Sequence, residues 1–298
     1  MIARIMRVLP LGLLLAFEGA PSPSGLRICA DPNNLPFSNE AREGFENKIA
    51  TLIGRELHRP IEYVWWAQRR GFVRNTLSAG SCDLVVGTVS GMEMLATTRP
   101  YYTSTYVFVS RHDRALDVSS FDDPRLKNLR IGVQLVGDDF ANTPPAHALA
   151  NRGMTRNIVG YTLYGDYRRP HPASQIVDAV ARGDVDLAVV WGPLAGYFAK
   201  TSPTKLDIVP VSPRRDPPAL PFVFDISMGV RRRDSTFRHS IDEIISRKRA
   251  SIDSILDAYG VPRVNAITTS RSAEQPDPSS RLLLGMTSEV IPSKARDR

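Results

Sequence analysis

The sequence predicts an α/β fold made of two similar lobes, each a mainly parallel sheet flanked by helices. Three observations predict it: strand-like and helix-like segments alternate, the alternation starts again 103 residues later, and a final strand and helix follow without a third lobe. Alternation of this kind is typical of parallel sheets whose two faces are covered by helices.

The first lobe begins with a predicted strand at Leu26–Ala30. Apolar residues then recur at helical spacing from Phe45 to Leu57, which predicts an amphipathic helix. A second strand at Ile61–Trp65 leads into a short helix through about Ala79, and the apolar strand Leu84–Val86 follows.

The second lobe repeats this order. Leu129–Val133 resembles Leu26–Ala30 at an offset of 103 residues, and Gly183–Val190 resembles Gly80–Val86 at the same offset. Two landmarks that share one offset indicate two lobes of similar design.

A late strand at Asp225–Arg231 and a long helix at Ser235–Ala258 complete the fold, and Gly260 and Pro262 end that helix. Because they must dock onto an existing lobe, the chain crosses between lobes twice, near residues 108–113 and 220–226. Two crossings form a hinge. We therefore expect residues 26–110 with 224–262 in the first lobe and residues 111–223 in the second.

The two ends of the chain are expected to lie outside the fold. Residues 1–25 form a signal-peptide pattern, with Arg4 and Arg7 before a short apolar run, Val8–Phe17, that is well below the ~20 residues of a membrane span. An uncleaved anchor helix is the alternative. Residues 263–298 have no sustained apolar period and are predicted to be a disordered tail. We expect an exported periplasmic protein that does not insert into the membrane after cleavage.

Charge excludes one class of partner. The net charge is +7, of which residues 1–25 carry +1 and the tail carries +2, so the body has only +4. This excess is too small and dispersed for nucleic-acid binding, although it is compatible with docking on an acidic protein. The arginine runs are interpreted as solvated loop faces; they are Arg69–Arg70, Arg168–Arg169, Arg214–Arg215 and Arg231–Arg233.

The two cysteines, Cys29 and Cys82, are expected to form a disulfide because the exported compartment is oxidising. Two buried free thiols remain the alternative. Neither cysteine belongs to a CxxC pair, so a redox or zinc role is not predicted.

Motifs for catalysis or metal binding are absent from the sequence. Ser90 lies in GTVSG, which is not the GxSxG nucleophile motif, and there is no HExxH, Walker A or GxGxxG sequence. Asp138–Asp139 with Asp31 and nearby asparagines could ligate a hard cation, but turn chemistry explains these residues better. We predict no metal, no cofactor and no enzymatic activity.

A binding cleft is predicted where the carboxyl ends of the parallel strands meet. The side chains that follow those strands are aromatic, amide, hydroxyl and basic, a mixture typical of a small-molecule site. These candidate cleft residues are Asp31, Asn33, Phe37, Trp66, Arg69, Arg70, Thr88, Ser90, Gln134, Asp138 and Trp191.

The sequence resembles the amino-acid-type solute-binding proteins, family 3, over residues 26–262. The similarity lies in CADPNNLPFSN, TTRPYYTSTYVFV and IGVQLVG. It implies the two-lobed type II periplasmic-binding-protein fold. The strings WWAQRRGFVRNTL, GDDFANTPPAHALA and VVWGPLAGYFA look like the MoxJ/XoxJ-like subgroup associated with quinoprotein dehydrogenases. That resemblance implies an accessory partner of a pyrroloquinoline-quinone (PQQ)-dependent methanol or alcohol dehydrogenase or its cytochrome.

An ordinary α-amino acid is not the expected ligand. No arginine occurs between Asp83 and Arg99, where such receptors clamp the carboxylate, and Trp191 stands where they hold the ammonium. Two buried unpaired charges would each cost several kcal/mol. If Trp191, Arg69 and Arg70 line one cavity, a small planar or anionic ligand fits it; alternatively Trp191 fills the cleft and the arginines face solvent.

Two other functions stay open. One is a transporter's substrate-binding protein for an unidentified organic solute. The other is a periplasmic dehydratase, for which Asp31 is the only acid or base that we can place in the cleft.

Overall fold

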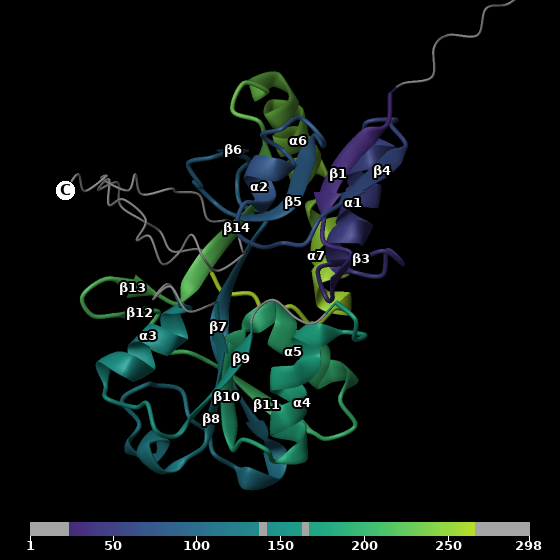
Figure 1. Cartoon of the computed structure of the whole chain (residues 1–298). Helices are drawn as coiled ribbons and strands as arrows, with labels where there is room; N and C mark the ends of the chain where they lie inside the picture. Colours follow the sequence, from purple (N-terminus) through teal and green to yellow (C-terminus); the bar gives the residue numbers. More distant parts are fainter. Residues whose placement is uncertain (1–23, 137–141, 163–166, 266–298) are drawn as a thin grey trace, which may run out of the picture.

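The computed structural model describes residues 24–136, 142–162 and 167–265, so nearly all of the predicted signal peptide lies outside the described residues. Within them a 10-stranded mixed sheet has the order β4-β1-β5-β14-β7-β10-β8-β9, with β11 beside β7 and β6 beside β14. The two ends of this sheet carry separate sets of helices and form the two lobes (Figure 1). The predicted two-lobed α/β fold is confirmed.

The first lobe has a parallel centre, in which β1 lies between β4 and β5. Its strands are β1 (Leu26–Ala30), β4 (Ile61–Trp65), β5 (Leu84–Val89), β6 (Ala96–Thr97) and the greater part of β14 (Val223–Val230), with the hairpin β2 (Asn33–Asn34) and β3 (Ser38–Asn39). Its helices are α1 (Phe45–Glu56), α2 (Phe72–Asn75), α6 (Ser235–Arg247) and α7 (Arg249–Ala258).

The second lobe has β8 between β9 and β10, again all parallel. Its strands are β8 (Ile131–Leu135), β9 (Ile158–Thr162), β10 (Leu187–Trp191) and β11 (Leu206–Pro210), with the hairpin β12 (Arg215–Asp216) and β13 (Leu220–Pro221). Its helices are α3 (Pro144–Asn151), α4 (Gln175–Arg182) and α5 (Gly192–Thr201), with the short 3₁₀ turns η1 (His112–Arg114), η2 (Pro124–Asn128) and η3 (Pro172–Ser174).

Two strands, β7 (Tyr102–Arg111) and β14, connect the lobes, and Figure 1 shows both between the upper and lower groups of elements. The first residues of β7, up to Thr105, pair with β14, whereas Tyr106 and the residues after it pair with β10 and β11. This change of partner comes a few residues before the crossing expected at 108–113. Every residue of β7 before Arg111 is buried, so the change of partner leaves no break in the burial pattern.

A third connection joins the lobes beyond the last helix. The Ser104 hydroxyl donates to the Pro262 carbonyl at 2.6 Å, and the Val264 N–H donates to the Thr103 carbonyl at 3.1 Å. Arg214 of the second lobe donates to the Asn265 carbonyl at 3.0 Å. Residues 263–265, which were predicted to belong to the tail, therefore make specific contacts with the body. These contacts could not be predicted, because hydrogen bonds to the backbone leave no apolar pattern in the sequence. Residues 266–298 lie outside the described residues.

Two elements differ from their predicted form. The helix expected over Ser235–Ala258 is divided at Lys248, whose ammonium group lies 2.9 Å from Glu56 at the end of α1. Strand β5 continues past Gly87 to Val89, with an irregularity in its pairing with β14. A methyl group at Gly87 would collide with the Glu46 carboxylate, so a larger residue there would require the Glu46 side chain to move.

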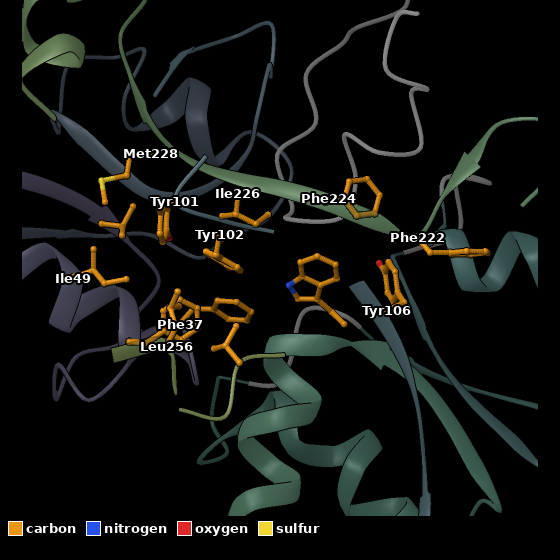
Figure 2. Packing of buried hydrophobic residues seen from close by; sticks show 14 of the residues in the cluster. Phe37, Ile49, Tyr101, Tyr102, Tyr106, Phe222, Phe224, Ile226, Met228 and Leu256 are labelled. Carbon is orange, nitrogen blue, oxygen red and sulfur yellow. The ribbon is translucent and has the colours of Figure 1, made fainter. Parts of the chain in front are cut away.

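One apolar cluster extends through both lobes. It includes Phe45 and Ile49 of the first lobe and Ile131 and Leu187 of the second. Figure 2 shows Tyr101, Tyr102 and Phe37 near Ile49 of α1, with Phe224, Phe222 and Tyr106 further along the same cluster. The hinge is therefore part of a shared core.

The expected disulfide is confirmed. Cys29 in β1 and Cys82 before β5 are bonded, with their Cα atoms 5.5 Å apart, and both side chains are buried. No helix among the described residues has the length and apolar character to cross a membrane.

Candidate functional site

Asp31 follows β1 directly and is buried at the junction of the lobes. Its carboxylate accepts hydrogen bonds from the backbone N–H groups of Asn33 (2.8 Å) and Gln68 (2.6 Å) and from the hydroxyl of Tyr167. Burial raises the pKa of Asp31, while the hydrogen bonds from Gln68, Tyr167 and Asn33 act in the opposite direction. Asp31 is 2% exposed, so its hydrogen-bonding capacity is used within the protein.

Contacts from the second lobe meet this residue and its neighbours. Tyr167 belongs to the second lobe, and its ring lies beneath the Arg69 guanidinium, 5.1 Å from Cζ to the ring centroid. The Asn33 side-chain amide donates to the Arg169 carbonyl at 2.8 Å. Since Asp31, Asn33 and Arg69 come from the first lobe, these three contacts close the lobes on each other.

Leu35 makes an apolar contact that also joins the two lobes. It lies in the loop after β1 of the first lobe, yet it is 2% exposed and packs in a cluster with Val109, Ile176, Val177 and Leu194 of the second. Opening the lobes would expose this side chain, which costs roughly 1.5–3 kcal/mol for a residue of this type.

Glu46 lies in the first turn of α1, where the helix meets the ends of β1 and β5. Its carboxylate packs against Gly87. Burial, together with the nearby charge of Asp31, raises the pKa of Glu46 to about 8. At neutral pH the protonated form therefore predominates.

The structure places three candidate cleft residues at the edge of the lobe junction. Trp66 is 46% exposed, and Arg69 and Arg70 are exposed. They occupy the loop after β4, which Asp31 holds through the Gln68 N–H. These side chains form the outer rim of the junction and not its interior.

Most of the other candidates pack within their own lobes. Phe37 packs against Phe45 with the ring centroids 5.3 Å apart, and the Thr88 hydroxyl donates to Met92 Sδ at 3.6 Å. Ser90 is half-buried beside β14, while Gln134 is buried in β8. Asp138 lies outside the described residues.

Trp191 ends β10 and packs against the two connecting strands. Its ring contacts Tyr106 of β7 and Phe224 of β14 edge-on, with centroids 5.4 Å and 5.9 Å apart. It is 8% exposed, and its indole N–H is buried without a partner among the described residues. This geometry favours the alternative in which Trp191 fills the junction and Arg69 and Arg70 face solvent.

Sequence reasoning missed Tyr167, Leu35 and Glu46. An acidic residue in the first turn of a helix that follows a strand could have indicated Glu46, since the helix N-terminus points to the strand ends. Tyr167 and Leu35 carry no local signal, because each is defined by its contact with the other lobe. Among the described residues no group of His, Cys, Asp or Glu is arranged to hold a metal ion.

No family model matches the chain. Over 260 residues it is 33% identical to protein MoxJ of Methylorubrum extorquens, an alignment that covers 83% of this chain and 84% of MoxJ. The chain belongs to the MoxJ family.

Solved structures agree with this assignment. The chain is similar to the periplasmic binding protein XoxJ from Methylobacterium extorquens AM1, with 36% identity and a TM-score of 0.67 over 81% of this chain and 100% of XoxJ. It is also similar to MxaJ from Methylophaga aminisulfidivorans, with 26% identity and a TM-score of 0.70 over 80% of this chain and 100% of MxaJ. An ancestral cationic amino-acid solute-binding protein, 19% identical with a TM-score of 0.61, shares the type II fold over 79% of this chain and 95% of its own.

The raised pKa of Glu46 predicts a pH-dependent stability of this MoxJ-family chain. A carboxyl group whose pKa is higher in the folded state than in the unfolded state stabilises the fold at low pH. This stability is lost as pH rises from about 4.5 to about 8. We expect Glu46→Gln to remove a slope of up to about 1.4 kcal/mol per pH unit in the free energy of unfolding. Urea unfolding between pH 5 and pH 8 measures it.

The matched control is Glu40→Gln, which changes an exposed carboxylate in the loop before α1. It should leave the pH dependence of the wild type unchanged. Equal slopes for Glu46→Gln and the wild type would contradict the assignment of the raised pKa to Glu46.

Proposed function

We propose that this protein is a periplasmic accessory component of a PQQ-dependent methanol or alcohol dehydrogenase system, and that it acts by binding a protein of that system. The observation that carries the proposal is the 33% identity to MoxJ over most of both chains. The structural likeness to the periplasmic binding protein XoxJ supports a location in the periplasm.

The lobe junction supports binding of a protein over capture of an amino acid. Asp31, which could hold a ligand ammonium group, already accepts hydrogen bonds from Asn33, Gln68 and Tyr167. Leu35 is inserted into the second lobe and stabilises the closed arrangement. A protein held closed by its own side chains presents a constant surface to a partner.

Deletion of the gene tests the proposal. We expect the deletion strain to lose growth on methanol or another alcohol and to show low dehydrogenase activity in periplasmic extracts, while amino-acid uptake stays normal. A plasmid copy of the gene should restore growth. A strain that oxidises alcohols normally but fails to take up an organic solute would identify a transporter's binding protein and overturn the proposal.

A further inference from the structure

The chain segment that follows α7 crosses from the first lobe to the second. We call residues 258–265 the strap. Helix α7 packs on α1 in the first lobe, and Figure 1 shows the yellow segment after it running past α5 of the second lobe toward the connecting strands. The far end of the strap is held by Arg214 of the second lobe. The strap therefore joins the two lobes beside the hinge.

Helix α5 approaches the strap so closely that no side chain fits between them. A Cβ atom added to Gly196 would lie only 1.9 Å from the Gly260 carbonyl oxygen. Four residues earlier, a Cβ atom added to Gly192 would lie 2.8 Å from Cγ of Pro262. The two glycines allow the backbone of the second lobe to pack directly on the strap.

Two side chains of α5 hold the start of the strap. The Lys200 ammonium group donates to the Ala258 carbonyl at 2.7 Å. The Tyr197 ring stacks on the Tyr259 ring, with the centroids 5.6 Å apart and the planes 19° from parallel. The Tyr259 hydroxyl in turn donates to the Glu43 carbonyl of the first lobe. Tyr259 is therefore held by both lobes.

The middle of the strap is bonded to the connecting strand β7. The Ser104 hydroxyl donates to the Pro262 carbonyl at 2.6 Å. The Val264 N–H donates to the Thr103 carbonyl at 3.1 Å. Directly after these residues, at Thr105, β7 ends its pairing with β14 and begins to pair with β10 and β11. The strap is thus fixed to the part of β7 where a hinge movement would bend the chain.

We propose that the strap is a built-in lock that keeps the two lobes closed without the help of a ligand. It acts together with the contacts of Asp31, Asn33 and Leu35, which join the loop after β1 to the second lobe. Opening must break both sets of contacts, and the atoms of both belong to the chain itself. A receptor that captures a solute between its lobes has to open to admit it, whereas this chain keeps one shape. The inference holds whatever the partner of the protein is.

The reactivity of a cysteine at position 35 measures how often the lobes open. Leu35 is buried in the second lobe's cluster, and both native cysteines are bonded to each other, so only the Leu35→Cys thiol is available to a maleimide when the lobes open. We expect it to react at least about 100-fold more slowly than a thiol at the exposed position of Ser78→Cys, the protection that an open population of about 1% gives. Equal rates would show that the lobes open freely and would overturn the proposal.

Two further substitutions in the Leu35→Cys protein weaken the strap. Gly196→Ala places a methyl group against the Gly260 carbonyl, and Ser104→Ala removes the hydrogen bond to Pro262. We expect each to speed labelling at least about 5-fold, the effect of losing one ordinary hydrogen bond. The control, Thr201→Ala at an exposed position of α5, should label within about 2-fold of the parent.

A cysteine inside one lobe separates lobe opening from unfolding. Ala50 is buried in α1 of the first lobe, so the Ala50→Cys thiol should stay protected when Gly196→Ala or Ser104→Ala is added. If it reacts faster by the same factor as the Leu35→Cys thiol, the strap stabilises the whole fold and the proposed lock is wrong. If neither substitution speeds labelling at position 35, the contacts of Asp31 and Leu35 alone keep the lobes closed, and the lock is wrong as well.

The lock and the proposed function can fail separately. The labelling experiment uses the purified chain without a dehydrogenase, so rapid labelling at position 35 removes the lock and leaves the proposed function in place. Normal alcohol oxidation in the deletion strain removes the proposed function and leaves the lock in place.

Discussion

We expect Trp191→Ala to lower the free energy of unfolding by about 3–5 kcal/mol, the usual cost of truncating a buried tryptophan. The indole is 8% exposed and packs edge-on against Tyr106 and Phe224, which belong to the two strands that connect the lobes. Removing it leaves a cavity at the hinge, where neither lobe can collapse without moving the other. Denaturant unfolding of the purified protein measures the loss.

Trp191→Phe is the matched control. It keeps an aromatic ring between Tyr106 and Phe224 and removes an indole N–H that is buried without a partner. A loss of only about 1 kcal/mol is expected, because most of the packing remains. An alanine variant that unfolds like the wild type, yet fails to support alcohol oxidation in the deletion strain, would show that the indole contacts a bound molecule instead of the hinge.

Removal of the disulfide should have an effect of similar size. Cys29 and Cys82 are separated by 53 residues, and this segment contains α1, β4 and α2. In the chain-entropy model, opening a loop of this length costs about 4 kcal/mol. We therefore expect Cys29→Ala with Cys82→Ala to lower the free energy of unfolding by about that amount.

The control for the disulfide is the effect of reductant on each protein. Reductant should destabilise the wild type by about the same 4 kcal/mol and leave the alanine variant unchanged, because the variant has no bond to reduce. Two free thiols titrated in the denatured wild type without reductant would contradict the bond.

Much of the fold could be predicted because the spacing of apolar residues in the sequence indicates which face of each strand or helix is buried. The strand at Leu26–Ala30 and the helix from Phe45 are clear in the sequence, since their apolar periods match the faces that they bury. The second lobe was predicted from the repeat of the same pattern. The break at Lys248 was missed, because the apolar positions before and after it share one helical spacing.

The candidate site was predicted less well, for a physical reason that Asp31 illustrates. Its place after β1 follows from the strand, but its contact with Tyr167 joins residues 136 positions apart. Local periodicity in the sequence does not predict a contact between residues so far apart. Arg69 and Trp191 were both placed near the cleft, yet the sequence could not say that one faces solvent and the other the hinge.

The sequence by itself determined the α/β class, the repeated lobe and the resemblance to the MoxJ/XoxJ-like subgroup, because each depends on residue types at fixed spacing. It left the Cys29–Cys82 bond as an expectation beside two free thiols, and the distance between the two strands decided it. Only the tertiary structure decided how the lobes meet: Leu35 inside the second lobe, Tyr167 on Asp31, and the Asn33 amide on the Arg169 carbonyl. These contacts depend on the relative placement of two lobes. That placement is set by packing around the hinge and not by the pattern of either lobe.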